Sequence, residues 1–588
     1  MYTDDKTTQV VLAMLKAYGI KNIVVSPGTR NCGFAASVQS DPFFNVYSVV
    51  DERSAAYFAT GLAFETDGPV VITCTGATAS RNYLSALTEA FYRRLPVIAL
   101  TFAHDSGNAY SLTQQHLDRS VSQNDVKLVS HSLPKVVDEK SKQTVELILN
   151  AAFIKCMYGR RGPVHIDVMY LGTKFNVPTL PEVTRAEYVS VYDLMDKKKR
   201  TAIMEELEGK KVGVFIGSHP KMSEALTAAI SAFAEKYHAP VFVDHTSNYH
   251  GNNKVLIGQI CDVMLTDNRP DVMIDLGSIC GQYSLSRLYT NTPVWRVSDA
   301  GELQQRAGRT VRYFDCAEEF FFKQNAKAGE NLVPVNYYEE IVAELEGMKL
   351  GELPFSGVFV AKHYSQKLPA GCVLHTSILN SLRSVNFFKF DESIDIICNV
   401  GGFGIDGPVS TLLGQSVSNR DRLYFGQIGD LAFFYDMNAL GNRHVGGNLR
   451  ILLVNNNLGV EFRVNTWLTR ELGKDGIEPF IAARGHNGSA REWVQSCGFH
   501  YMSASSKEEF LEKLDEFCHP DLKHFDRPVV FEVFTSGDDE VDAVQVMRGK
   551  PKTIFGIRKG RCSFGVRLAA CFIRDKQKRR EFREKHSK

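Results

Sequence analysis

The chain has 588 residues, 44% of them hydrophobic and 23% charged, and this ordinary globular composition excludes disorder over most of its length. Its 68 Lys and Arg residues balance 67 Asp and Glu residues, which argues against a surface that binds nucleic acid throughout. No apolar run reaches the roughly 18 residues of a membrane span, and the polar, acidic start lacks the layout of a secretory signal. The 12 cysteines are scattered without a Cys-x-x-Cys pair, a pattern typical of reduced thiols. We therefore expect a cytoplasmic protein without a transmembrane segment or a nucleic-acid partner.

Short apolar runs alternate with helical patterns along most of the chain, which predicts parallel sheets wrapped by helices. The clearest expected strands are 22–26, 46–50, 70–73, 96–100, 163–168, 212–216, 241–243, 272–275, 395–398, 423–425, 451–454 and 529–533. Connections at 196–210 and 349–354 separate the blocks. We expect an α/β fold of three doubly wound parallel-sheet domains at 1–180, 190–348 and 355–545, followed by an extension at 546–588.

The first block carries a tight turn after its first strand. The turn 26–30 (Ser-Pro-Gly-Thr-Arg) exposes Arg30, which could clamp a carboxylate or be an ordinary surface arginine. A second turn, at Thr75 and Gly76, precedes a predicted helix at 80–92. Its small residues would let a flat ligand approach the backbone, or they simply cap the helix.

A pair of carboxylates follows another strand of this block. The strand 46–50 runs into Asp51 and Glu52 and then into a predicted helix at 54–65. A carboxylate directly after an apolar strand can be partly desolvated, which raises its pKa and suits proton transfer. The alternative is that both residues only complement the helix dipole.

The third block holds the most informative segment. Gly429 and Asp430 precede a predicted helix at 433–440, and the strand 451–454 leads into an Asn-rich turn with Asn457. A Gly-Asp turn after a strand directs backbone N–H groups towards an anion such as a diphosphate. Asp and Asn side chains, with the Gly459 carbonyl, are hard oxygen ligands that suit Mg²⁺. The alternative is an Asp helix cap followed by an ordinary turn.

Taken together, these segments resemble the thiamine-diphosphate (ThDP) enzymes, whose signature is Gly-Asp-Gly followed further along by Asn-Asn. They resemble most the 2-succinyl-5-enolpyruvyl-6-hydroxy-3-cyclohexene-1-carboxylate synthases of menaquinone biosynthesis, which have Leu in place of the last Gly. The matching motifs are 26–30, 51–53, 404–407, 429–431 and 435–440. They occur in one order across all three blocks.

The resemblance implies a pyrimidine-binding first domain, a central spacer domain and a diphosphate-binding third domain, with ThDP and Mg²⁺ (or Mn²⁺) as cofactors. Glu52 would activate the aminopyrimidine, and Ile405 would be the apolar wedge that bends the cofactor. Asp430, Asn457 and Gly459 would hold the metal. The other implied cofactor contacts are Thr75, Gly76, Ser381, Gly404, Gly429, Leu431 and Ala432. Because such sites form between two subunits, a homodimer or homotetramer is implied.

The substrate positions match the menaquinone enzymes only in part. Those enzymes join the donor 2-oxoglutarate to the acceptor isochorismate. Arg30 and Gln115 match acceptor positions, and His104 stands where that family has an arginine. A histidine there could contact an anion when protonated, or be a surface residue.

Two further arginines of that family are replaced here by Val385 and Val400, and Arg383 comes two places early. Leaving a buried carboxylate unpaired would cost roughly several kcal/mol. We therefore expect a donor that is smaller or less anionic than 2-oxoglutarate, pyruvate being the simplest.

The leading hypothesis is a ThDP-dependent transferase that decarboxylates a 2-oxo acid and joins its acyl unit to an acceptor. The alternatives are a 2-oxo-acid decarboxylase that releases an aldehyde and a non-catalytic ThDP-fold scaffold. Arg30 and Gln115 favour an acceptor, and the presence of Glu52, Asp430 and Asn457 argues against a scaffold.

The extension at 546–588 is basic, with fifteen Lys and Arg residues against three Asp and Glu residues. We expect a solvated extension. Its apolar stretch at 562–573 leaves an amphipathic membrane-surface or partner-binding segment as the alternative.

Overall fold

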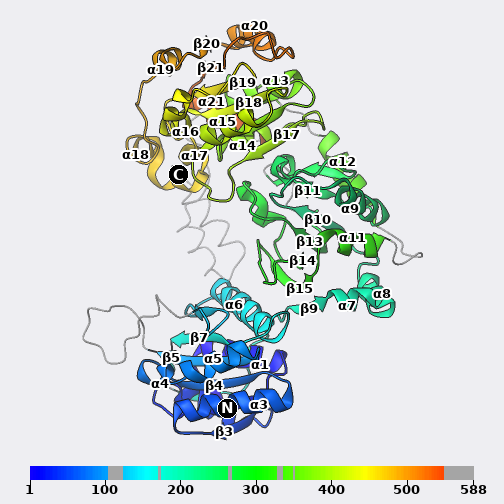
Figure 1. Cartoon of the computed structure of the whole chain (residues 1–588), viewed down its shortest axis with the longest axis vertical. Coiled ribbons are helices and arrows are strands. Elements are labelled where there is room, and N and C mark those ends of the chain that lie inside the picture. Colours follow the sequence, from blue (N-terminus) through cyan, green and yellow to red (C-terminus); the bar gives the residue numbers. More distant parts are fainter. Residues whose placement is uncertain are drawn as a thin grey trace, which may run out of the picture.

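The computed structural model describes residues 1–103, 124–169, 172, 174–261, 268–326, 335–347 and 351–548. Three parallel sheets follow one another along the chain, with helices between their strands (Figure 1). A small antiparallel pair joins β1 (Tyr2–Thr3) to β8 (Phe175–Val177). None of the described helices is long and apolar enough to cross a membrane. The expected α/β class is confirmed.

The first sheet has the strand order β3-β2-β4-β5-β7-β6, and all its paired strands are parallel. Its strands are β2 (Asn22–Val25), β3 (Asn45–Ser48), β4 (Val70–Thr75), β5 (Val97–Ala103), β6 (Ser130–Ser132) and β7 (Val164–Met169). Its helices are α1 (Lys6–Ala17), α2 (Cys32–Gln39), α3 (Glu52–Thr66), α4 (Thr78–Arg81), α5 (Leu84–Tyr92) and α6 (Glu139–Met157).

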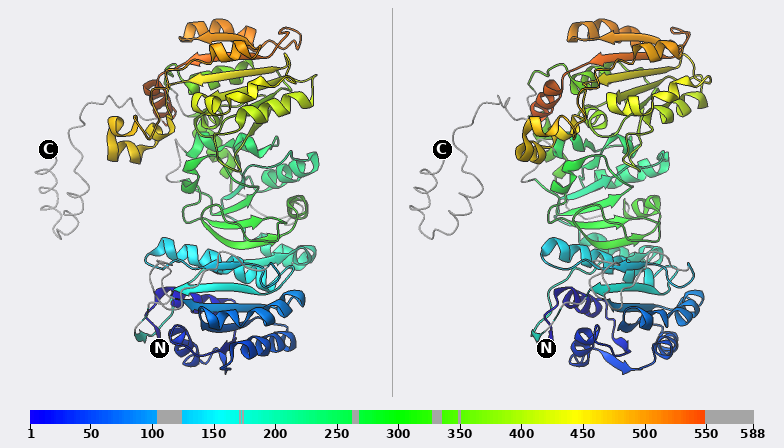
Figure 2. Two further views of the ribbon diagram at one scale, coloured as in Figure 1. Left: turned by 60° about the vertical axis from the view of Figure 1, so that its left-hand side comes forward. Right: turned by 90° about the vertical axis from the view of Figure 1, so that its left-hand side faces the viewer.

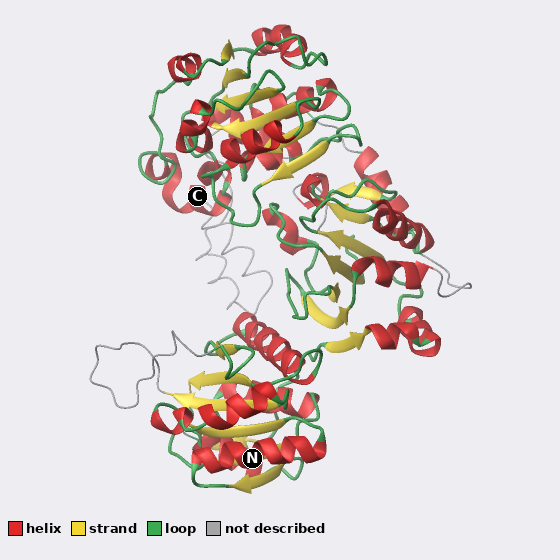
Figure 3. Cartoon of the chain, in the orientation of Figure 1, coloured by secondary structure: helices red, strands yellow, loops and turns green. Residues whose placement is uncertain are grey.

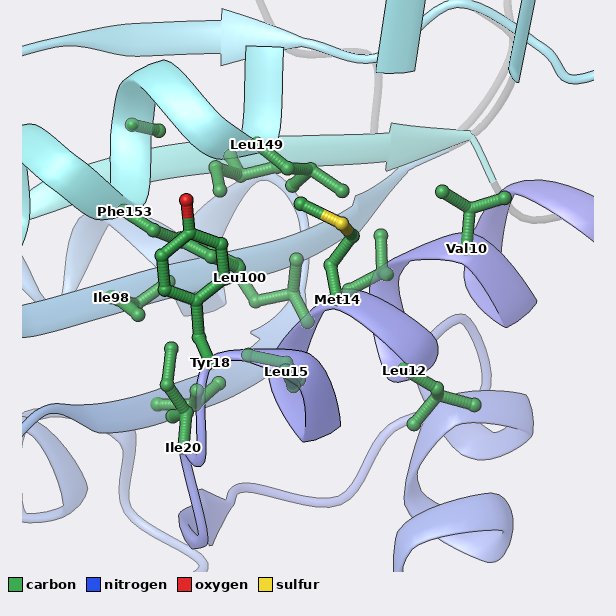
Figure 4. Packing of buried hydrophobic residues seen from close by; sticks show 14 of the residues in the cluster. Val10, Leu12, Met14, Leu15, Tyr18, Ile20, Ile98, Leu100, Leu149 and Phe153 are labelled. Atoms are coloured by element: carbon green, nitrogen blue, oxygen red, sulfur yellow. The ribbon is translucent and has the colours of Figure 1, made fainter. Parts of the chain in front are cut away.

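Alternate residues of β5 point to opposite faces of this sheet, and both faces are buried. Ile98 and Leu100 pack with the α1 and α6 side chains (Figure 4). Val97 and Ala99 pack with α3 and α5 on the other face. Because a strand covered on both sides has no polar face, it appears in the sequence as a continuous apolar run.

The middle sheet has seven parallel strands in the order β12-β11-β10-β13-β14-β15-β9. They are β9 (Glu187–Ser190), β10 (Val212–Ile216), β11 (Val241–Val243), β12 (Lys254–Leu256), β13 (Val272–Leu276), β14 (Pro293–Val297) and β15 (Arg309–Asp315). Its helices are α7 (Val191–Met195), α8 (Lys197–Glu205), α9 (Glu224–Lys236), α10 (Ile257–Cys261), α11 (Glu318–Ala326) and α12 (Tyr337–Glu346), with 3₁₀ turns η1 (His245–Ser247) and η2 (Tyr283–Arg287).

The third sheet has six parallel strands in the order β17-β16-β18-β19-β21-β20. They are β16 (Val373–Thr376), β17 (Asp395–Cys398), β18 (Tyr424–Gly429), β19 (Leu449–Asn455), β20 (His500–Ala504) and β21 (Val529–Phe534). Its helices are α13 (Gly357–Lys367), α14 (Asn380–Val385), α15 (Pro408–Ser418), α16 (Asp430–Tyr435), α17 (Glu461–Val464), α18 (Thr466–Ile477), α19 (Arg491–Ser496), α20 (Lys507–Phe517) and α21 (Gly537–Met547), with the 3₁₀ turn η3 (Met437–Gly441).

The three sheets are stacked along the length of the molecule, with the middle sheet between the other two (Figure 2). The middle and third blocks are in direct contact, since the backbone N–H of His245 in η1 donates to the side chain of Asn386, which follows α14, at 3.2 Å. Gln259 also donates to the Phe387 carbonyl at 2.8 Å. Colouring by secondary structure shows the same arrangement, with strands inside and helices outside each layer (Figure 3).

Two expected helices are broken in the structure. The segment 433–440 is not one helix, because α16 ends at Tyr435 and the turn η3 follows. The cause is Asp436, whose carboxylate accepts hydrogen bonds from the Ser410 N–H and hydroxyl, both at 2.6 Å. The segment 80–92 is divided between α4 and α5.

Candidate functional site

The carboxyl ends of β18 and β19 bring the predicted metal ligands together. These strands are neighbours, with Gly429 opposite Val454, so the residues that follow them meet at one edge of the sheet. Asp430, 3% exposed, accepts hydrogen bonds on Oδ2 from the backbone N–H groups of Asn456 at 3.1 Å and Asn457 at 2.6 Å. A turn with left-handed backbone at Asn457 (φ 64°) makes this contact possible.

A segment that the sequence did not indicate folds over these ligands. Asn457 Oδ1 accepts from the backbone N–H groups of Gly485 at 3.1 Å and Asn487 at 3.2 Å. The N–H of Gly459 donates to the Ala482 carbonyl at 2.6 Å. His486 Nε2 lies 3.0 Å from Asp430 Oδ2. No periodic pattern marks this stretch, and only its contacts in three dimensions associate it with the site.

A cavity of about 260 Å³ opens beside this edge, and we call it the cofactor cavity. The predicted residues that line it are Ser381, Ile405, Gly429, Asp430, Leu431, Ala432 and Gly459. Ser377 links two of them, since its hydroxyl accepts from the Gly429 N–H at 3.1 Å and donates to the Ser381 hydroxyl at 2.9 Å. Backbone N–H groups and hydroxyls at the start of a helix are donors that suit a diphosphate.

The loop before α15 brings Ile405 to the cofactor cavity. Asn399 donates to the Thr411 hydroxyl at 2.9 Å and so fixes the two ends of this loop. A Cβ on Gly404 would lie 2.2 Å from the Asp406 side chain, so this position accepts only glycine without rearrangement. The apolar Ile405 side chain is thereby held against the cofactor cavity.

Three carboxyl groups line the cofactor cavity, and one of them, Glu461, is paired with Arg383. Asp430, Glu461 and Glu540 line it, and none of the described lining residues is Lys, Arg or His. Glu540 accepts from the Gly357 N–H at 2.8 Å and the Thr535 hydroxyl at 2.7 Å, and burial raises its pKa to about 7. The Asp430, Asn457 and Gly459 oxygens are of the type that a hard divalent metal takes, and such a cation would offset the charges of the Asp430 carboxylate and of a bound diphosphate.

The first sheet gathers a second group of predicted residues at the carboxyl ends of β2 and β4. A Cβ on Gly28 would lie 2.2 Å from Thr75 Oγ1, so only glycine lets the turn that carries Arg30 approach β4. Thr75 Oγ1 has no hydrogen-bond partner among the described residues. Gly76 donates its N–H to the Phe102 carbonyl at 2.8 Å.

Asp51 and Glu52 have different roles in the structure. Asp51 is the N-cap of α3 and accepts from the Ser54 N–H at 2.9 Å, which is the capping alternative considered for this pair. Glu52 is the first residue of α3, half-buried, and its side chain makes no such cap. Its carboxylate is therefore left for another partner.

The two groups do not meet within one chain. Glu52, Thr75 and Gly76 belong to the first sheet, and Ile405 and Asp430 to the third, with the middle sheet between them (Figures 1 and 2). His104 and Gln115 lie outside the described residues.

The three residues at the expected donor position are all buried in protein contacts. Arg383 pairs with Glu461 at 2.5 Å, with the two side chains 9% and 12% exposed. Val385 belongs to the core of the third sheet. Val400 joins a small apolar cluster with Ile378, Leu382 and Cys398, against which Ile405 packs.

Comparison with known proteins points to thiamine diphosphate as the cofactor. Residues 5–126 match the family described as thiamine pyrophosphate enzyme, N-terminal TPP binding domain. The chain is 29% identical over 562 residues to the 2-succinyl-5-enolpyruvyl-6-hydroxy-3-cyclohexene-1-carboxylate synthase of Phocaeicola vulgatus, covering 92% of this chain and 97% of that protein. The synthases of the same name from Bacteroides fragilis and Desulfotalea psychrophila are each 29% identical, over 560 and 557 residues. Those alignments cover 91% and 88% of this chain and 97% and 96% of the relatives.

A cavity beside Asp430, the match of residues 5–126 to the N-terminal TPP binding domain of thiamine pyrophosphate enzymes, and relatives that align with nearly the whole chain together make this protein similar to the thiamine-diphosphate-dependent enzymes along most of its length.

Proposed function

We propose that the protein is a ThDP- and Mg²⁺-dependent carboligase that decarboxylates a 2-oxo acid and transfers its acyl unit to an acceptor. Relatives named as synthases align over 97% of their length, which supports the same class of reaction here. When bound, ThDP supplies the carbon nucleophile and the electron sink for loss of CO₂.

The residues of this chain would bind and orient that cofactor. Asp430, Asn457 and Gly459 would hold the metal, and Ser381, whose hydroxyl accepts from Ser377, would donate to the diphosphate. Ile405, which lines the cofactor cavity, would be the apolar contact that bends the cofactor. Glu52 would exchange a proton with the pyrimidine ring, since α3 leaves its carboxylate without a capping role.

The donor in this proposal is smaller or less anionic than 2-oxoglutarate, and two observations support that statement. Arg383, the one arginine near the expected position, is already paired with Glu461. Val400 presents an apolar cluster where a second carboxylate would need a cation. A buried carboxylate without a partner would cost several kcal/mol, on the order of a hundredfold or more in affinity.

The complete site in this proposal takes residues from two copies of the chain. The first and third sheets lie at opposite ends of one chain (Figure 2), so Glu52 needs a partner copy to reach a cofactor cavity. The helices α3 and α5 expose Tyr57, Phe64, Leu84 and Tyr92 to solvent, an apolar face that a second copy would cover.

Release of CO₂ from a panel of 2-oxo acids, with ThDP and Mg²⁺ and with or without isochorismate, tests the reaction and the donor. Turnover of pyruvate or another small donor with consumption of an acceptor supports the proposal. Saturation by micromolar 2-oxoglutarate together with loss of isochorismate contradicts the donor assignment. Aldehyde release that no acceptor changes would make the enzyme a simple decarboxylase.

Subunit mixing tests the shared site. Glu52→Gln and Asp430→Asn chains are each expected to be inactive, but a mixed dimer would contain one intact site. Co-expression in equal amounts should restore about a quarter of the parent activity, because half of the dimers are mixed and each holds one good site of two. Absence of any recovery, with mixed dimers shown to form, contradicts a site made from two copies.

A further inference from the structure

Three carboxyl groups line the cofactor cavity, and Glu540 differs from the other two. Asp430 belongs to the predicted metal site, and Glu461 forms a buried ion pair with Arg383 at 2.5 Å. Glu540 stands in the first turn of α21 and is only 4% exposed, and no described residue forms an ion pair with it. A buried carboxylate on the wall of a cavity that takes a diphosphate would repel the ligand.

The two oxygens of Glu540 have different surroundings. Oε1 accepts hydrogen bonds from the Gly357 N–H at 2.8 Å and from the Thr535 hydroxyl at 2.7 Å. Oε2 has no hydrogen-bond partner among the described residues, and a Cβ on Gly357, which also lines the cavity, would lie 3.3 Å from it. Two donors therefore fix Oε1, and Oε2 is the oxygen that can carry a proton and donate it to a ligand.

The charged groups around Glu540 favour its neutral form. After burial itself, the carboxylates of Asp430 and Asp539 raise its pKa. Arg383 and Arg548 line a smaller cavity together with Glu540, but Arg383 is already in its buried ion pair. A fully ionised diphosphate carries more charge than one divalent cation neutralises, so the loaded site would favour the neutral acid still more.

We propose that Glu540 is a binding residue for the diphosphate, which takes up a proton from solvent when the cofactor binds and donates it from Oε2. This inference rests on the proposed function, because it needs ThDP as the ligand. A hydrogen bond from a carboxylic acid to a phosphate oxygen is a bond to a charged group, and such bonds are stronger than those between neutral groups. The same side chain as a carboxylate would oppose binding.

Proton uptake at Glu540 makes the affinity for ThDP depend on pH. Above the pKa of the free group, about 7, the bound state holds more protons than the free state, so the affinity falls as pH rises. One proton taken up per site corresponds to a fall of about tenfold for each pH unit. Below that pKa the group is already protonated in the free protein, and this dependence disappears.

Calorimetric titration with ThDP at saturating Mg²⁺, at about pH 7.5 and about pH 8.5, tests the assignment. The affinity of the parent should fall by about five- to tenfold between the two. Titrations in two buffers of different ionisation enthalpy count the protons taken up. Glu540→Gln, nearly isosteric with the neutral acid and still a donor, should take up about one proton fewer per site and should lose this pH dependence. Asp539→Asn, which removes the neighbouring carboxylate of the same helix, is the matched control and should keep it.

The outcomes separate this assignment from the proposed function. A parent that does not bind ThDP would contradict the proposed function and the role of Glu540 with it. Binding with equal proton uptake in the parent and in Glu540→Gln would overturn the role of Glu540 alone.

Infrared difference spectra decide the question if Glu540→Gln does not fold. They are measured on Glu52→Gln, which lacks the carboxyl group expected at the pyrimidine. The band of a protonated carboxyl group should appear at about pH 8.5 when ThDP and Mg²⁺ are added. Its absence would overturn the proposal.

Discussion

Replacing Glu461 by Gln would remove the carboxylate that pairs with the buried Arg383 side chain. The two side chains are almost fully buried and 2.5 Å apart, so both charges have lost their water. Removing one partner of such a pair costs about 3–5 kcal/mol. An exposed pair contributes at most about 1 kcal/mol, and Glu352 with Lys507 is such a pair at 3.0 Å on the same part of the chain.

Urea unfolding without cofactor would measure this difference, because two of the three tryptophans, Trp467 and Trp493, report on the third sheet. Glu461→Gln should lower the unfolding midpoint strongly and Glu352→Gln hardly at all. Adding Arg383→Met to Glu461→Gln should recover most of the loss, since no charge then stays buried. Equal midpoints for the two single variants would refute the buried pair, and with it the argument that Arg383 is unavailable to a substrate.

Three further outcomes are expected. Burial lowers the pKa of His245 from 6.5 to about 4. The stability that the neutral ring contributes is therefore complete above pH 6.5 and is lost as pH falls towards 4. In His245→Gln the urea midpoint should depend less on pH between 6.5 and 4, and an unchanged pH profile would contradict this. A Cβ on Gly258 would lie 2.6 Å from the Asn386 carbonyl oxygen, so Gly258→Ala should lower the free energy of unfolding by about 1–3 kcal/mol, measured by thermal unfolding. Gly414→Ala is the control, because a Cβ there meets no atom within 4 Å and should not destabilise the protein. Asp430→Asn should keep the fold but weaken Mg²⁺-dependent ThDP binding by about tenfold or more in calorimetry, and unchanged affinity would remove Asp430 from the metal site.

Strands buried on both faces were the part of the fold that sequence could predict. The strand at 212–216 agrees with β10 residue for residue, because a continuous apolar run has one simple explanation. The strand β16 was missed, since its His375 and Thr376 are polar yet buried, and the His375 ring bonds to Gln415 at 3.1 Å. Such a strand is specified by its neighbours in the sheet and not by its own pattern.

The candidate site divides in the same way. Asp430 and Asn457 could be placed together because each follows an apolar strand, and the ends of neighbouring parallel strands meet. His486 could not, since its approach to Asp430 depends on a chain reversal without periodic pattern. Nor could the sequence tell Asp51 from Glu52, because only the backbone geometry at the start of α3 decides which carboxylate caps the helix.

The Asp430 carboxylate at the cofactor cavity has a thermodynamic consequence. The Asp430 carboxylate on its wall would repel a free diphosphate, and a metal bound to that carboxylate would attract it. Each ligand removes the electrostatic penalty of the other, so their affinities are linked and must rise by the same factor. The concentration of free magnesium in the cell would therefore set how much of the enzyme is loaded at a given thiamine diphosphate level, which makes the ion a determinant of activity as well as a structural part of the site.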